Sequence, residues 1–269
     1  MRIALVGHGK MGAALLSQWL AVADREFPDH HFTIVDPALD PEATRSASPQ
    51  ATFLPELPAT VEHAFDLVIV AVKPQMLDAV LPLYRERLAE GGFVASIAAG
   101  CSLARLRSLA GGVAAIRIMP NLPAAIGQGV SGLCADPSAS PEQRETVERL
   151  MAAAGTAIWV KDEDQLDRFT AVAGSGPGYV FEIARSYADA AQALGFDAET
   201  AKQLVLGTLA GTIAMAQQSP LDLDALRNSV TSKNGTTAAG LDALNADGGL
   251  DRRIEATLAA AYARAVELR

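Results

Sequence analysis

The first 160 residues alternate between short apolar runs and longer stretches in which apolar residues recur every three or four positions. The runs are typical of strands buried in a parallel sheet, and the stretches are typical of helices that cover it. Strands are predicted at residues 3–6, 32–35, 67–72, 93–97, 115–118, 130–134 and 157–160. Helices are predicted at 10–23, at 75–89 with Met76, Val80, Leu83 and Leu88 on the apolar side, after Ser102, and at 141–154 behind Ser140. This alternation predicts a doubly wound α/β domain.

The pattern changes near Lys161. From there on no stretch has the pattern of a strand, and helices are predicted from Pro177 to about 194 and at 197–217, 222–230 and 250–268. We therefore expect two closely joined domains, residues 1–161 and an all-α C-terminal domain of residues 162–269. The alanine-rich apolar helices exceed what a small domain can bury by itself, which indicates a partner chain and a dimerisation role.

The first predicted strand runs into three glycines of the pattern G-x-G-x-x-G, which are Gly7, Gly9 and Gly12. In dinucleotide-binding folds the first glycine allows a tight turn, the second lets the backbone approach a pyrophosphate, and the third lets the next helix pack closely on the strand. Free N–H groups at the start of that helix would point at the phosphates. Such patterns also occur in structural turns, but the strand and helix around this one favour a Rossmann-type dinucleotide site. The residues between the glycines, which we also expect to contact the cofactor, are His8, Lys10 and Met11.

An acidic residue, Asp36, ends the second predicted strand. An acid in this place accepts hydrogen bonds from the adenosine ribose hydroxyls and repels a 2′-phosphate, so it favours NADH over NADPH. Because Pro37 follows, Asp36 is also typical of a turn. Arg45 lies close enough in the sequence to meet a 2′-phosphate, which leaves NADPH as the alternative.

Polar residues follow two other predicted strands. Lys73 comes directly after the strand at 67–72, and Asn121 comes shortly after the strand at 115–118. In an open parallel sheet, ligands bind beyond the carboxyl ends of the strands. We therefore expect Val72, Lys73 and Pro74 beside the ribose or nicotinamide. Asn121 is expected at the nicotinamide carboxamide or at the substrate. A solvated lysine and a turn-forming asparagine are the alternative interpretations.

Composition and charge limit the possible partners. The chain carries 31 acidic residues against 22 Lys and Arg, a net charge of −9, so it lacks the positive field that nucleic acid or an anionic membrane requires. Its two cysteines, Cys101 and Cys134, indicate buried hydrophobic residues in a reducing, cytoplasmic compartment rather than a disulfide framework. There is no uninterrupted apolar run of about 18 residues, and the histidine spacing suits no metal site. We expect a soluble cytoplasmic protein without a metal.

Small hydroxyl residues gather between two predicted helices of the second domain, in the segment SVTSKNGTTAAGL at residues 229–241. Ser and Thr collect at helix caps, and Asn234 followed by Gly235 is a turn signal in its own right. A helix that starts with free amides and hydroxyls also forms a receptor for a carboxylate without needing arginine. The residues alone leave both interpretations open.

Five motifs follow one another along nearly the whole chain. They are GHGKMG at 7–12, AVKPQ at 71–75, RIMPNLP at 117–123, AGSGPGY at 173–179 and VTSKNGTTAAGLDAL at 230–244. In this order the sequence resembles the pyrroline-5-carboxylate reductase family. The resemblance implies reduction of the small molecule L-1-pyrroline-5-carboxylate to L-proline with NAD(P)H, the last step of proline biosynthesis. It also implies a helical domain that forms intertwined homodimers, which can assemble further.

The resemblance also assigns residues. Those on the cofactor positions of the family are Gly7, Gly9, Gly12, Lys73 and Pro74, and those on its substrate-binding loop are Ser232, Gly235, Thr236 and Thr237. Thr237 is the hydroxyl that we expect to orient the imine nitrogen during catalysis. The sequence departs from the family pattern at Lys233 and Asn234, where proline and glycine are common, and at Gly178, where alanine is usual.

Two other functions fit parts of the same pattern. A β-hydroxyacid dehydrogenase of similar build needs a catalytic lysine on a helix of the second domain, where Lys202 is the only lysine besides Lys233. A nucleotide-sensing protein would keep the glycine loop without turnover. The sequence has no evident general acid–base pair, and this agrees with hydride transfer to a protonated imine, which depends more on orientation than on proton abstraction.

Overall fold

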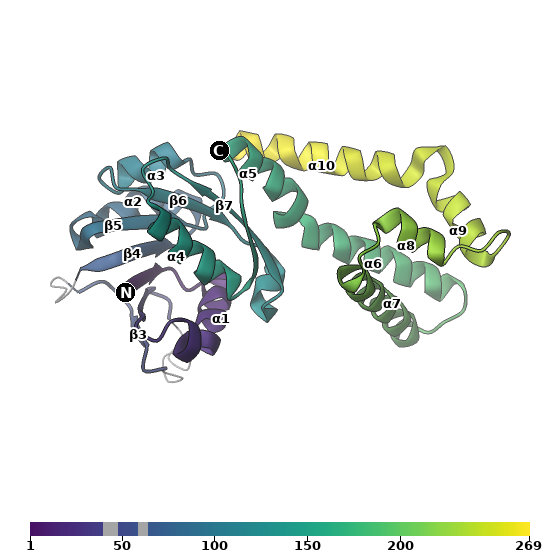
Figure 1. Ribbon diagram of the computed structural model, residues 1–269, viewed down its shortest axis with the longest axis horizontal. Coiled ribbons are helices and arrows are strands. Elements are labelled where there is room, and N and C mark those ends of the chain that lie inside the picture. The colour runs from purple at the N-terminus through teal and green to yellow at the C-terminus, as the bar shows by residue number, and fades with distance from the viewer. Residues whose placement is uncertain (40–47, 59–63) are drawn as a thin grey trace. The chain divides into compact units, whose positions relative to one another are not determined.

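The computed structural model describes residues 1–39, 48–58 and 64–269, and contacts within the chain divide it into two compact units (Figure 1). The first unit contains residues 1–175 together with 261–269, and the second contains residues 176–260. The boundary that the sequence predicts after residue 161 lies just beyond the last strand. By contacts the first unit continues to Ser175, because Leu166 of the following helix is fully buried in its core.

The first unit is built around a sheet of eight strands in the described part of the chain, in the order β3-β2-β1-β4-β5-β6-β7-β8. The strands are β1 (Arg2–Val6), β2 (His31–Val35), β3 (Ala51–Leu54), β4 (Phe65–Val70), β5 (Leu88–Ser96), β6 (Ala115–Met119), β7 (Gly129–Ala135) and β8 (Gly155–Trp159). All seven predicted strands are confirmed. The strand order reverses between β1 and β4, and this is the switch point beside which open α/β sheets bind their ligands.

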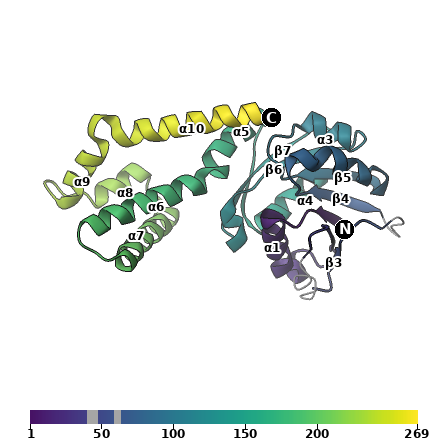
Figure 2. The same cartoon turned by 180° about the vertical axis from the view of Figure 1, so that it is seen from behind.

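Helices cover both faces of this sheet (Figure 1 and Figure 2). They are α1 (Lys10–Glu26), α2 (Leu77–Val80), α3 (Leu103–Leu109), α4 (Pro141–Ala152) and α5 (Glu163–Phe169). Successive residues of a strand point to opposite faces. Ile3 of β1 therefore packs in one hydrophobic cluster with Trp19 of α1, whereas Ala4 packs in a second cluster with Leu77 of α2. The doubly wound prediction is confirmed.

The prediction of a single helix at residues 75–89 is wrong. The chain forms two short 3₁₀ helices, η1 (Pro74–Met76) and η2 (Leu81–Arg87), on either side of α2, and Leu88 already begins β5. Pro82 removes one helical N–H, which favours the tighter and shorter elements. The apolar face is also different: the buried side chains are Leu77, Leu81 and Tyr84, whereas Met76 and Leu83 are exposed.

Two features of the sheet differ from expectation. The edge strand β3 is not predicted, because it is short and only partly buried. β7 is antiparallel to β6, whereas its other neighbour, β8, is parallel to it. Only the 3₁₀ helix η3 (Leu122–Ile126) connects β6 to β7, and a connection this short reverses the chain, since a parallel pair needs a long crossover.

Side-chain caps fix the starts of two helices that the sequence predicts, α3 and α4. The Ser102 hydroxyl accepts a hydrogen bond from the Arg105 N–H at the start of α3. Ser140 and Gln143 form a reciprocal capping box at the start of α4. Each cap satisfies N–H groups that the first helical turn leaves unpaired, so these helix starts are determined locally.

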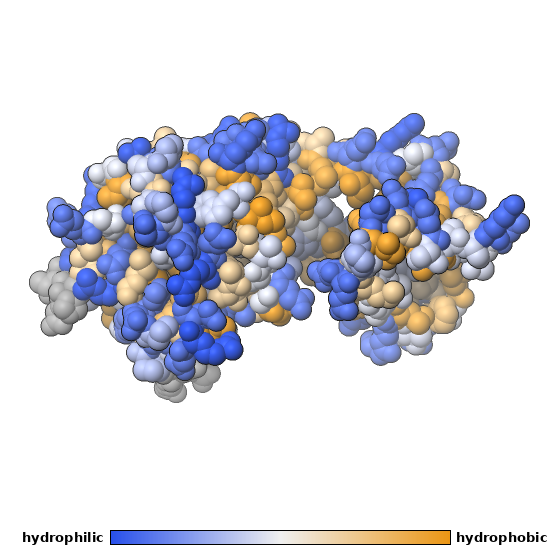
Figure 3. Space-filling model, viewed as in Figure 1, coloured by the Kyte–Doolittle hydropathy of each residue, from blue (hydrophilic) through white to orange (hydrophobic). Residues whose placement is uncertain are grey.

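The second unit is entirely helical, as the sequence predicts. Its helices are α6 (Gly176–Ala193), α7 (Ala198–Gln218), α8 (Leu223–Ser229), α9 (Thr236–Asn245), the 3₁₀ helix η5 (Ala246–Gly248) and α10 (Gly249–Leu268), which continues into the first unit. The buried apolar residues of this unit are Ala191, Ala201 and Val205. Larger side chains such as Phe181, Ile213 and Met215 are exposed, and apolar groups are visible on this surface in Figure 3. None of the helices in the described ranges is long and apolar enough to cross a membrane.

Candidate functional site

A cleft of about 540 Å³ opens at the carboxyl ends of β1, β2 and β4 in the first unit. Five of the predicted cofactor positions line it, which are Gly7, Gly9, Asp36, Val72 and Lys73. The cleft lies beside the reversal of strand order, where dinucleotides bind in folds of this kind. Folding therefore brings together polar residues that the sequence places after three different strands.

Each glycine of the first loop has its own physical reason. Gly7 has a φ of +101°, and a Cβ there would lie 2.8 Å from the carbonyl oxygen of Ala71. A Cβ on Gly12 would lie 2.5 Å from the carbonyl oxygen of Gly7, so a larger residue would force α1 away from the strand. The Cβ position of Gly9 has no atom within 4 Å and is open toward a ligand. This is the arrangement that close approach of a pyrophosphate requires.

The start of α1 has the features of an anion-binding site. Gly9 precedes the helix and provides no side-chain cap, and the first turn contains no acidic side chain. The backbone N–H groups of Lys10, Met11 and Gly12 belong to the first turn, which has no partner within the helix. Together with the positive end of the helix dipole, they fit the phosphates of a dinucleotide.

The carboxylate of Asp36 is oriented by two backbone N–H groups. The N–H of His8 donates to Oδ2 at 2.6 Å, and the N–H of Ala38 donates to Oδ1 at 2.8 Å. A second carboxylate, that of Glu56 just after β3, also lines the cleft. The sequence interpretation missed Glu56 because it missed the strand that positions it. Arg45, on which the NADPH alternative depends, lies outside the described residues.

The opposite wall of the cleft begins where β4 ends. Lys73 is exposed and occupies the N-cap position of η1 without a side-chain capping bond, and Pro74 is the first residue of that helix. Beyond them the wall is apolar and includes Met76, Val80 and Tyr84. Burial raises the pKa of Tyr84 to about 12, so its phenol stays protonated at neutral pH. Tyr84 was missed because the predicted helix placed a different face toward the protein.

Asn121 does not line this cleft. It is buried, its side-chain nitrogen donates to the carbonyl of Ala173 at 3.1 Å, and its side-chain oxygen accepts from the N–H of Val130 at 2.8 Å. Both ends of the amide are therefore bound to backbone groups of the protein. Its predicted role at the nicotinamide carboxamide has no geometric support in the cleft.

The hydroxyl-rich loop of the second unit has a defined backbone. Asn234 has a φ of +60°, and a Cβ on Gly235 would overlap the hydroxyl of Ser232. Gly235 precedes α9 without a side-chain cap, so the first N–H groups of that helix are free for an anion. Thr236 and Thr237 are the first two residues of α9 and both are exposed, as is Ser232. The predicted substrate-loop residues therefore surround one helix start.

Other groups with possible chemistry are less suited to a site. Cys101 and Cys134 are buried free thiols, and burial raises the pKa of Cys134 to about 11, so it remains a protonated thiol. In the described ranges no group of three or more His, Cys, Asp or Glu residues could hold a metal ion. The cleft and the hydroxyl-rich loop therefore remain the candidate functional sites.

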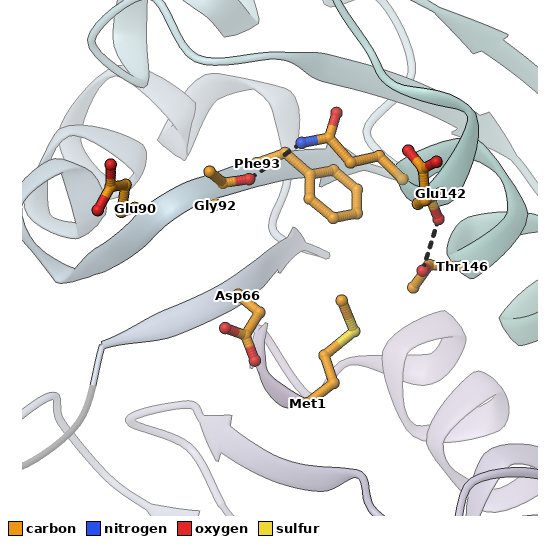
Figure 4. A pocket seen from close by; sticks show the side chains of 9 residues that line it. Met1, Asp66, Glu90, Gly92, Phe93, Glu142 and Thr146 are labelled. Carbon is orange, nitrogen blue, oxygen red and sulfur yellow. Dashed lines mark hydrogen bonds between the residues drawn. The ribbon is translucent and has the colours of Figure 1, made fainter.

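A small pocket of about 120 Å³ lies at the opposite edge of the sheet, beside Met1 and the start of β4 (Figure 4). Asp66, Glu90 and Glu142 surround it, but Asp66 already accepts a hydrogen bond from the N–H of Arg2 at 2.6 Å. The pocket is too small for a dinucleotide. It also lies at the amino ends of the strands, whereas ligands of open α/β sheets bind at the carboxyl ends.

Comparison with known proteins agrees with the geometry over the full length of the chain. A pyrroline-5-carboxylate reductase from Pseudomonas aeruginosa is 37% identical over 268 residues, which cover 99% of this chain and 96% of that protein. The chain belongs to the pyrroline-5-carboxylate reductase family. A family model described as pyrroline-5-carboxylate reductase dimerisation matches residues 163–268, and one described as NADP oxidoreductase, coenzyme F420-dependent, matches residues 2–100.

Solved structures of pyrroline-5-carboxylate reductases share the whole fold. The enzyme from Coxiella burnetii superposes with a TM-score of 0.89 at 29% identity, covering 99% of this chain and 97% of that one. The enzyme from Plasmodium falciparum, solved with NADP bound, superposes with a TM-score of 0.81 at 22% identity, covering 100% of this chain and 98% of that one. The Rossmann-type and helical halves predicted from the sequence are thus the two halves of this family's fold.

Proposed function

We propose that this chain reduces L-1-pyrroline-5-carboxylate to L-proline with a reduced nicotinamide dinucleotide. The observation that carries the proposal is the full-length similarity to named pyrroline-5-carboxylate reductases, with the glycine cleft and the Thr236–Thr237 helix start both intact. The cofactor supplies a hydride to the imine carbon, C5. The protein binds and orients the two reactants.

The cleft holds the dinucleotide in this proposal. The open position at Gly9 and the free N–H groups of α1 bind the pyrophosphate, with His8, Lys10 and Met11 along the same turn. Val72, Lys73 and Pro74 lie beside the ribose or nicotinamide. Asp36, held by the His8 N–H, accepts hydrogen bonds from the adenosine ribose hydroxyls. With Glu56 in the same cleft, two carboxylates oppose a 2′-phosphate, so NADH is the preferred cofactor.

The loop before α9 holds the imine acid. The substrate carboxylate binds to the free N–H groups at Thr236 and Thr237 and to the hydroxyl of Ser232. The hydroxyl of Thr237 forms a hydrogen bond with the ring nitrogen and thereby fixes the face of C5 that meets the nicotinamide. In this scheme the proton on the imine comes from solvent, so Thr237 orients the substrate and is not a strong acid.

The active form in this proposal is a cytoplasmic homodimer formed by the helical unit. Its exposed apolar side chains, Phe181, Ile213 and Met215 among them, are more than an isolated unit of this size leaves to solvent. Interfaces of obligate dimers bury more than about 2,000 Å², so dilution alone is expected not to separate the chains. Sedimentation at low concentration tests this and measures any further assembly; a folded, active monomer would contradict it.

The proposal is tested by mixing the purified protein with NADH and L-1-pyrroline-5-carboxylate. The expected result is NADH oxidation only when the imine is present, with one proline formed per NADH consumed. A β-hydroxy acid with NAD⁺ is the control, and it is expected to give no turnover. Binding of NADH without oxidation would instead favour a nucleotide-sensing protein, and turnover of the hydroxy acid alone would favour a dehydrogenase of that class.

A further inference from the structure

Asn121 connects two motifs that lie far apart in the sequence. It follows β6, and its side-chain nitrogen donates to the carbonyl of Ala173, in the π-helix η4 (Thr170–Gly174), at 3.1 Å. Its side-chain oxygen accepts from the N–H of Val130, in β7, at 2.8 Å. One amide group thus ties the carboxyl end of β6 to the next strand and to the turn where the first compact unit ends.

The Ala173 carbonyl needs a partner because of a proline. In a continuous helix this carbonyl would accept a hydrogen bond from the N–H of residue 177, four positions later. Residue 177 is Pro177, which has no N–H, and Ser175 lies between η4 and α6 outside both helical segments. The Asn121 amide supplies the donor that Pro177 cannot.

The surroundings of the joint favour a fixed structure. At the end of η4 the N–H of Ser175 donates to the carbonyl of Thr170 at 2.9 Å, which is the wide spacing of a π-helix. Such wide turns are frequent at functional sites. Asn121 is 7% exposed, so loss of its side chain would leave the Ala173 carbonyl and the Val130 N–H without this partner in a largely dry environment.

We propose that Asn121 is a positioning residue that fixes the joint at residues 173–177, through which the chain passes from the dinucleotide unit into the helical unit. The helix that leaves this joint, α6, belongs to the unit that also carries the Thr236–Thr237 loop. A loosened joint therefore lowers the fraction of molecules in which imine and nicotinamide are aligned. The effect on turnover rests on the proposed function, whereas the link between Asn121 and Pro177 does not.

The test is a double-mutant cycle between Asn121→Ala and Pro177→Ala. Asn121→Ala is expected to lower kcat for the imine by about 5- to 50-fold and to leave the Kd for NADH within about twofold of the wild-type value. Pro177→Ala supplies an N–H four residues after the Ala173 carbonyl, the spacing of a helical hydrogen bond. In the Pro177→Ala background, the loss of kcat caused by Asn121→Ala is expected to shrink at least about threefold. The reason is that the Ala173 carbonyl regains a partner, and only the Val130 N–H stays without one.

The matched control is Gln18→Ala, which removes another side-chain bond to a backbone carbonyl, that of Ala125 in η3. Gln18→Ala is expected to change kcat for the imine only slightly, and by the same amount in the wild-type and Pro177→Ala backgrounds. Two results would overturn the proposal: equal effects of Asn121→Ala in both backgrounds, or a main effect on the Kd for NADH, which would make Asn121 a cofactor ligand.

The same cycle is read by urea unfolding, which needs no activity. If the wild type does not reduce the imine, the proposed function fails, but coupling of Asn121 to Pro177 in the unfolding midpoints still supports the fixed joint. If Asn121→Ala alone does not fold, recovery of folded protein in the double variant is the expected result. A double variant that also remains unfolded would contradict the proposal.

Discussion

The backbone N–H of His8 donates a hydrogen bond to Oδ2 of Asp36 at 2.6 Å, so the glycine loop after β1 is fastened to the acid that ends β2. The second carboxylate oxygen accepts the N–H of Ala38 at 2.8 Å. Each oxygen has a further lone pair, which leaves capacity for the ribose hydroxyls of a cofactor. In the proposed function, the side chain that selects the cofactor thus also orders the loop that binds its phosphates.

Replacing Asp36 tests this selection. Asp36→Ser is expected to lower kcat/KM for NADH by roughly 10- to 100-fold, the value of a hydrogen bond to a charged group, and to raise the NADPH/NADH ratio of kcat/KM. Steady-state kinetics with both cofactors measures it. Asp24→Asn removes an exposed carboxylate on α1 and is expected to change neither value. A wild-type enzyme that strongly prefers NADPH would refute the assignment and direct attention to Arg45.

Two substitutions in the glycine loop are expected to impair different properties of the protein, stability in one case and NADH binding in the other. Gly12→Ala places a Cβ 2.5 Å from the Gly7 carbonyl oxygen and should lower the free energy of unfolding by about 1 to 3 kcal/mol. Gly9→Ala meets no atom within 4 Å and should unfold almost like the wild type, but bind NADH at least about tenfold more weakly. Thermal unfolding and NADH titration separate the two effects. Equal loss of stability in both variants would contradict the role given to Gly9.

The strands and the glycine loop were predictable because their signals are local. A short apolar run such as residues 3–6 is too short for a helix, and the glycines after it have steric reasons that any sequence shows. The caps Ser102 and Ser140 are local in the same way. The strands and the glycine loop position the cleft to which we assign the cofactor, so the place of that cleft followed from the sequence.

The features that were missed depend on tertiary contacts. β3 contains too few buried residues to be recognised in the sequence. Because this strand was missed, the position of Glu56 just after it was missed as well. The face of residues 75–89 was misjudged because Pro82 shortens the helices and changes the spacing of buried positions. The partners of Asn121 come from Val130 and Ala173, and no pattern within the sequence indicates that pairing.

Thr237 tests the substrate side of the site. Thr237→Ala removes one hydrogen bond to the imine nitrogen and should lower kcat/KM for the imine by roughly 5- to 150-fold, about 1 to 3 kcal/mol, with little change in the Kd for NADH. The control is Thr257→Ala, because the Thr257 hydroxyl donates to the Arg253 carbonyl within its own helix at 2.7 Å. If Thr237→Ala retains full turnover, or loses NADH binding together with its fold, Thr237 is only part of a helix start.

A buried ion pair gives a prediction on pH. Asp167 is almost fully buried and lies 3.0 Å from Nη1 of Arg269. Burial raises the pKa of the Asp167 carboxyl, and the guanidiniums of Arg269 and Arg117 partly oppose that shift. Because the pKa is higher in the folded chain, the stabilising contribution of this group is full below its unfolded pKa, about 3.9, and is lost as the pH rises through the folded pKa.

Arg269→Met removes an opposing charge and should raise the pKa of Asp167 further. The loss of stability relative to the wild type is then expected to be small near pH 3 and to grow to about 1 to 3 kcal/mol near pH 7, less than for a fully buried pair because Arg269 is partly exposed. Urea unfolding across this pH range measures it. Arg264→Met breaks the exposed pair with Glu267 and should have almost no effect. A loss for Arg269→Met that is independent of pH would contradict the account.

The central claim is that this chain transfers hydride from nicotinamide C4 to C5 of the imine ring. The most direct test supplies NADH carrying deuterium at both C4 positions together with unlabelled L-1-pyrroline-5-carboxylate, and locates the label in the product by mass spectrometry and NMR. The account predicts L-proline with deuterium at C5. Proline without deuterium, or no proline at all from folded protein saturated with both reactants, would contradict it.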